Sequence, residues 1–156
     1  MDDHKEFFKK FFELHGEETE TDESGDSVTA ETPTFDTKKR SAIRKYLKEQ
    51  KENITLLSNR PGSGYEEEDY ALRLYSIGKI EEGLVFAFAS KRKKFDAPAL
   101  YTKTAEVLHR NGMYREEIDF LESGIKYMQI GQSRAKDDMK KNLLIAKALL
   151  QKEKEG

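Results

Sequence analysis

The sequence predicts an all-α fold, and three observations lead to this prediction. Apolar residues recur at helical spacing in most segments between residues 37 and 152. A cluster of glycine, proline and serine at 58–64, and single glycines or a proline elsewhere, separate these segments. Two of the segments also align with each other at an offset of 34 residues, which places Gly78 over Gly112. A period of this length with a glycine at the bend is typical of stacked helix–turn–helix units.

The chain is expected to begin with a short amphipathic helix over residues 1–16. One face of this helix carries four phenylalanines and the other face is charged. The four are Phe7, Phe8, Phe11 and Phe12. Because so short a helix is marginal alone in water, the phenylalanines need a surface: the body of the chain, a partner or second copy, or a membrane. The near balance of Lys and Glu on the polar face disfavours the membrane.

Two adjacent segments of opposite charge are expected to follow. Residues 17–36 carry eight carboxylates and no basic residue, and they contain almost no large apolar side chain, so a disordered acidic linker is predicted. Residues 37–60 carry eight basic and two acidic residues. The apolar spacing predicts a basic helix over 37–57, and the glycine-rich stretch 58–64 then ends it.

Residues 61–152 are expected to form the main helical domain. Four helices are predicted over 65–77, 80–93, 97–110 and 113–128, as two hairpins that turn at Gly78 and Gly112. Pro98 is typical of the first turn of a helix. A last helix is predicted from Ser133 to Lys152, with one apolar and one polar face, as an end cap requires.

Residues 64–152 resemble a tetratricopeptide-like array of two repeats and a capping helix. The second repeat matches the aromatic, small and large apolar positions of this family best, at Tyr101, Ala105, Leu108, Gly112, Tyr114, Leu121 and Gly124. The first repeat matches at Ala71, Leu74, Gly78, Ile80, Gly83 and Ser90. Two glutamates depart from the pattern: Glu67 stands at an aromatic position and Glu117 at a small one. The alternative is an all-α bundle whose two hairpins share their spacing by chance.

Since about three repeats are usually needed for a stable stack, helix 37–57, with or without the N-terminal helix, is expected to complete it; self-association is the alternative. The resemblance also implies a binding groove along the first helix of each hairpin and the capping helix. The groove residues are mixed in charge: Tyr65, Glu68, Leu72, Tyr75, Ser76, Thr102, Glu106, His109, Arg110, Lys136, Lys140 and Leu143. Such a lining favours a peptide with apolar and charged anchors, bound as an extended strand or as a helix.

The sequence lacks the residue patterns of the common catalytic sites. Cysteine is absent, and no nucleotide-binding loop, hydrolase or zinc-protease motif occurs. Glu106 and His109 have the spacing of a helical carboxylate metal site, but the second pair that such a site needs is missing. We therefore expect no enzyme activity, no metal and no cofactor. No apolar run is long enough for a membrane span, and a cytoplasmic location is expected.

The sequence thus predicts a protein–protein interaction module, an adaptor or regulatory scaffold that binds a protein or peptide or associates with itself through the N-terminal helix. The alternative is a small nucleic-acid-associated regulator that uses the basic helix 37–57. In that alternative phosphate groups would be contacted by Lys38, Lys39, Arg40 and Arg44.

Overall fold

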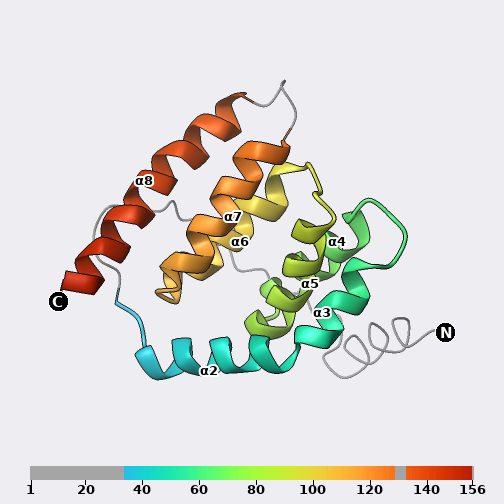
Figure 1. Cartoon of the computed structure of the whole chain (residues 1–156), viewed down its shortest axis with the longest axis horizontal. Helices are drawn as coiled ribbons and strands as arrows, with labels where there is room; N and C mark the ends of the chain where they lie inside the picture. Colours follow the sequence, from blue (N-terminus) through green and yellow to red (C-terminus); the bar gives the residue numbers. More distant parts are fainter. Residues whose placement is uncertain (1–33, 129–132, 156) are drawn as a thin grey trace.

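A computed structural model describes residues 34–128 and 133–155 of the chain. These residues form seven helices and no strand, which confirms the predicted all-α class (Figure 1). The helices are α2 (Thr37–Glu49), α3 (Lys51–Ser58), α4 (Tyr65–Ser76), α5 (Ile80–Arg92), α6 (Pro98–Arg110), α7 (Tyr114–Tyr127) and α8 (Ser133–Glu155). The predicted N-terminal helix 1–16 and most of the predicted linker lie outside the described residues.

The segment predicted as one helix over 37–57 is divided into α2 and α3 at Gln50, so that prediction was wrong. Gln50 has φ −94° and ψ 13°, outside the helical region, and its side-chain oxygen accepts a hydrogen bond from Asn53 (2.7 Å). The bend lets α2 lie across the ends of other helices while α3 contacts α5 (Figure 1). Each part then buries its own apolar residues, Ile43 in α2 and Ile54 and Leu57 in α3.

The two helical hairpins, α4–α5 and α6–α7, begin and end within one or two residues of the predicted positions. Their turns have the same geometry. Gly78 and Gly112 have φ of 82° and 69°, the left-handed conformation that glycine adopts without strain. The residue after each glycine donates a backbone hydrogen bond to a leucine five positions earlier, at 2.8 Å in the first turn and 2.9 Å in the second. Each glycine also bonds back three positions, which completes a Schellman motif in both hairpins.

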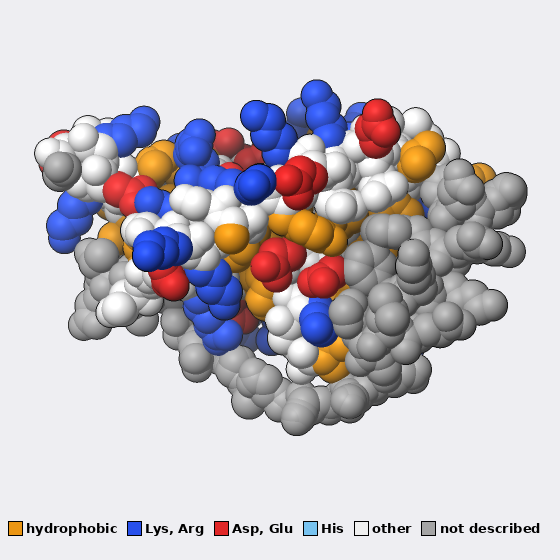
Figure 2. Space-filling view, turned by 90° about the horizontal axis from the view of Figure 1, so that it is seen from below, with side chains coloured by type: hydrophobic (Ala, Val, Ile, Leu, Met, Phe, Trp, Pro, Cys, Tyr) orange, Lys and Arg blue, Asp and Glu red, His pale blue; other side chains and the backbone are white. Residues whose placement is uncertain are grey.

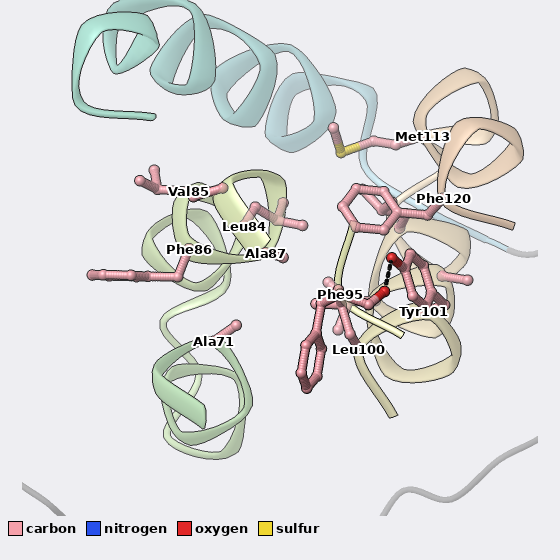
Figure 3. Packing of buried hydrophobic residues seen from close by; sticks show 14 of the residues in the cluster. Ala71, Leu84, Val85, Phe86, Ala87, Phe95, Leu100, Tyr101, Met113 and Phe120 are labelled. Atoms are coloured by element: carbon pink, nitrogen blue, oxygen red, sulfur yellow. Dashed lines mark hydrogen bonds between the residues drawn. The ribbon is translucent and has the colours of Figure 1, made fainter. Parts of the chain in front are cut away.

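The hydrophobic core lies between the hairpins, with α5 at its centre. Leu84 and Ala87 point from α5 toward Phe120 of α7 (Figure 3). The rings of Phe88 and Phe120 meet edge to face with centroids 5.0 Å apart. Because α5 contacts α2, α3, α4 and α6, it is buried along most of its length and needs almost no polar face.

The C-terminal helix α8 packs beside α7 and also touches α6 (Figure 1). It buries Met139, Ala146 and Leu149 and exposes charged residues on its other side. Although α8 has 23 residues, neither it nor any other described helix combines the length and apolar character that crossing a bilayer requires.

Candidate interaction surfaces

Glu68, predicted to line the groove, is instead buried between α4 and α6, with 6% of its surface exposed. Burial and the nearby Asp69 raise the pKa of Glu68, and the backbone of Leu100, in the first turn of α6, acts in the opposite direction. Glu68 is therefore covered by the neighbouring helix and is not an open contact residue.

Two more predicted groove residues also face inward. The hydroxyl of Tyr75 shares a hydrogen bond with the hydroxyl of Thr104 (2.9 Å), which links α4 to α6. His109 is buried, with 6% exposed, and its Nδ1 lies 3.0 Å from Oε1 of Glu117 on α7. Helical spacing predicted an outward direction for these side chains, because spacing alone does not show how closely the neighbouring helix approaches.

The other groove residues lie at the surface. Tyr65 is 63% exposed, Leu72 is half-buried, and Glu106 pairs with Arg110 across one helical turn (3.0 Å). We call the outer surface of the two adjacent helices the α4–α6 face; it consists of Tyr65, Leu72, Thr102, Glu106 and Arg110. Lys136 and Lys140 lie on α8, where Lys140 is exposed and Lys136 half-buried; α8 packs mainly against α7.

The two arginines predicted to contact nucleic acid are both engaged within the protein. Arg40 donates hydrogen bonds to the backbone oxygen of Gly112 (3.0 Å) and to the carboxylate of Glu153 on α8 (2.6 Å). Arg44 binds both oxygens of Glu116 on α7, at 2.8 and 2.9 Å. Such a bidentate interaction with a carboxylate uses the donors that would otherwise contact a phosphate. These two arginines hold α2 on the body and do not form part of an open binding surface.

The position of α2 gives a structural reason for its basic character. It crosses the N-terminal ends of α5 and α7, whose first turns contain Glu81 and Glu82 in α5 and Glu116 in α7 (Figure 1). Tyr46 of α2 lies close enough to these acids that burial, Glu82 and Glu81 together raise its pKa to about 12. A basic helix over the acidic ends of two others is a favourable charge arrangement.

The last residues of the predicted disordered linker belong to the folded body. The ring of Phe35 packs edge to face against Tyr114, with centroids 6.1 Å apart, and the guanidinium of Arg40 lies 4.9 Å from its centre. Asp36 caps α2 by accepting a hydrogen bond from the backbone N–H of Lys38 (2.9 Å). The part of the chain before residue 34 is thus attached at a fixed point next to the α6–α7 turn.

Four lysines of α2 face solvent: Lys38, Lys39, Lys45 and Lys48. None of them forms an ion pair with a carboxylate among residues 34–128 and 133–155. We call these four the lysine row. Figure 2 views the molecule from the side on which α2 lies and shows Lys and Arg side chains there, interspersed with Asp and Glu. On a helical wheel Lys38, Lys45 and Lys48 fall within about 80° of one another, and Arg40 and Arg44 fall together on a different side, so the spacing separates the two sets without showing which one faces solvent.

Comparisons of the chain with family models, with curated proteins and with solved structures found no match. The predicted docking residues of the N-terminal helix, Phe7, Phe8, Phe11 and Phe12, lie outside the described part of the chain.

Proposed function

We propose that the chain is a tetratricopeptide-like protein-interaction module that binds a peptide or a helix on the α4–α6 face. The equivalence of the two hairpins carries this proposal. Besides the matching glycine turns, the residues that precede α5 and α7 have the same conformation, with φ −91° and ψ 69° at Lys79 and φ −92° and ψ 67° at Met113. Two like hairpins whose first helices lie together support a stacked repeat, an architecture that presents the first helices as a continuous binding surface.

The chemistry of the α4–α6 face fits a peptide with both apolar and charged anchors. Tyr65 is a large exposed aromatic side chain, and Leu72 adds apolar area about two turns further along α4. On α6 the exposed Arg110 and the half-buried Glu106 offer charges of both signs. Tyrosine and arginine are the residue types that most often dominate binding energy at protein interfaces.

A peptide library displayed on phage tests this proposal, because it presents many candidate partner segments to the chain at once. Peptides selected on the full chain should lose binding at least about tenfold to the variant Leu72→Arg/Arg110→Glu, which changes the α4–α6 face. The matched control, Ala148→Arg/Arg115→Glu, makes the same kind of charge changes at exposed positions of α8 and α7. Peptides that bind both variants equally, or that respond only to the control, would refute a binding site on the α4–α6 face.

We also propose that the N-terminal helix predicted over residues 1–16 regulates the module by docking on this face. Four phenylalanines on one helical side provide the apolar anchors that such a surface can take. Deletion of residues 1–16 should then strengthen the binding of selected peptides while the chain stays monomeric. A fall in molecular mass from dimer to monomer would instead favour self-association through this helix.

A second candidate function is a nucleic-acid-associated regulator, which is favoured by the exposed lysine row and its lack of an acidic partner among the described residues. Replacing all four lysines by glutamine tests it without breaking the ion pairs of Arg40 and Arg44. Micromolar binding to generic DNA or RNA that weakens steeply with salt and is lost in this variant would support the candidate. Binding that persists in the variant would place the nucleic-acid contact elsewhere.

A further inference from the structure

The basic residues of α2 divide into two sets with different surroundings. Arg40 and Arg44 point toward the body and pair with Glu153 and Glu116. The lysine row points to solvent and has no carboxylate partner among the described residues. We propose that the acidic segment 17–33 of the same chain lies along the lysine row and shields it from other polyanions. This interaction does not involve the α4–α6 face.

The lysine row concentrates positive charge on a short length of helix. From Lys38 to Lys48 the helix rises by about 15 Å, which is about two Debye lengths at physiological salt, so each lysine interacts mainly with its nearest neighbours in the row. An extended chain of negative charges can reach successive lysines along this length, which a single small ion cannot. An elongated acidic segment matches this surface better than a compact ligand.

The segment 17–33 has the charge that the lysine row requires. It contains seven carboxylates and no basic residue. The seven are Glu17, Glu18, Glu20, Asp22, Glu23, Asp26 and Glu31. They recur every few residues, so an extended chain can bring several of them to the lysines at once.

Chain geometry also favours this segment over any separate molecule. Phe35 and Asp36 fix its end at the start of α2, directly beside Lys38 and Lys39. The 17 residues of a flexible segment span about 23 Å on average, and α2 is about 20 Å long. A ligand tethered over such a distance has an effective concentration on the order of millimolar, well above that of a separate partner in most settings.

Carbodiimide cross-linking of the full chain tests the contact directly, because this reagent joins carboxylates to amines that touch. Mass spectrometry should find links within one chain from residues 17–33 to the lysine row. Four exposed lysines elsewhere serve as the internal control and should be linked far less: Lys94, Lys103, Lys141 and Lys154. Links spread evenly over all lysines, or confined to cross-linked dimers, would overturn the proposal.

Fluorescence anisotropy with a labelled 20-nucleotide oligothymidine tests the shielding, since this probe is a polyanion with no sequence content. A variant with all seven carboxylates changed to amides should bind the probe at least about tenfold more tightly than the natural chain at low salt. That gain should shrink as salt rises, and it should vanish when the lysine row is also changed to glutamine. No gain in affinity, or a gain that survives loss of the lysine row, would overturn the proposal. Neither result bears on peptide binding at the α4–α6 face, so the two proposals fail separately.

Discussion

The two hairpins share their turn geometry but differ in the side-chain contact that lies beside the turn. In the first hairpin the ring of Tyr75 lies against Gly83, so closely that a Cβ on the glycine would be 2.6 Å from the ring. Thirty-four residues later, the same two positions are His109 and Glu117, whose side chains form a buried hydrogen bond of 3.0 Å. An aromatic–glycine contact in one hairpin thus corresponds to a polar pair in the other.

At the end of each hairpin away from the turn, the two kinds of contact occur in the opposite hairpins: the polar pair lies in the first hairpin and the aromatic–glycine contact in the second. In the first hairpin Glu67 pairs with Lys93 at 2.8 Å, and both side chains are almost fully buried. In the second hairpin the position of Glu67 is taken by Tyr101, which packs against Gly124 so closely that a Cβ there would be 2.8 Å away. Each hairpin therefore has one aromatic–glycine contact and one buried polar or ionic pair, at opposite ends.

This exchange explains the two departures from the repeat pattern. Glu67 and Glu117 are the residues that do not match the expected aromatic and small types, and each has a partner in the same hairpin: Lys93 directly after α5 and His109 on α6. A buried carboxylate without a partner is strongly destabilising, whereas a well-paired one is nearly neutral. A glutamate can therefore replace the expected aromatic or small residue in such a hairpin, provided that a partner residue is present to pair with it.

The variant with the largest expected effect places in the first hairpin the glutamate of the His109–Glu117 pair, without its histidine. Gly83→Glu places a side chain where even a Cβ is too close to Tyr75, and it buries a carboxylate without a partner. We expect a loss of about 5 kcal/mol or more in the free energy of unfolding, measured by urea denaturation. The double variant Gly83→Glu/Tyr75→His recreates the pair of the second hairpin and should recover a large part of that loss. If the double variant is no more stable than Gly83→Glu alone, the two positions are not equivalent.

The next test removes one member of the ionic pair in the first hairpin. Lys93→Met leaves the buried carboxylate of Glu67 with the guanidinium of Arg60, at 3.9 Å, as a more distant neighbour of opposite charge. We expect a loss of about 3 kcal/mol, and the double variant Glu67→Leu/Lys93→Met should return most of it. Equal stability of Lys93→Met and the natural chain would show that this pair does not exclude water.

A matched pair of smaller changes compares the two turns. Gly78→Ala and Gly112→Ala both force alanine into a left-handed conformation, which costs about 1–2 kcal/mol. A Cβ at Gly78 meets nothing within 4 Å, whereas one at Gly112 would lie 2.4 Å from the ring of Phe35. Gly112→Ala should therefore be the more destabilising change.

The background variant Phe35→Ala provides the control for this comparison. Without the ring, the two alanine variants should lose the same free energy relative to their parent. A difference that remains in that background would mean that the two turns are not alike in their backbone strain.

The hairpins could be predicted closely from the sequence because their signals are local. A glycine at each bend and a proline at the start of α6 fix where helices stop and start, whatever the rest of the chain does. The offset of 34 residues between the two glycines is also the offset between matching positions in the helices, so one alignment predicted both hairpins.

The features that the sequence did not predict depend on partners far away in the chain. No glycine or proline marks the break at Gln50, which arises where α2 and α3 pack on different parts of the body. The inward direction of Arg40 and Arg44 follows from acids that lie at least 72 residues later. Glu68 and His109 are buried by the specific approach of α6 and α7, which helical spacing alone does not reveal.

The smallest expected effect is a pH dependence that comes from the polar pair of the second hairpin. Burial raises the pKa of Glu117 above its ordinary value of 4.5, and the hydrogen bond and charge of His109 oppose this. The folded chain then binds this proton more tightly than the unfolded chain, so stability falls as the pH rises from about 4.5 through the raised pKa. A tenfold difference in proton affinity corresponds to about 1.4 kcal/mol. Glu117→Gln cannot titrate and should lack this part of the pH dependence.

The role of the imidazole in this titration can be separated by a second variant. His109→Gln removes the charge that opposes the effect of burial, so the pKa of Glu117 should rise further and the loss of stability should extend to higher pH. Urea denaturation of the natural chain and both variants between about pH 4 and 7 measures this, at spacings of about half a pH unit. Three parallel stability profiles would mean that Glu117 is not desolvated as its burial implies. In that case the polar pair would be an open surface contact, and the contrast with the tight Tyr75–Gly83 contact of the first hairpin would be lost.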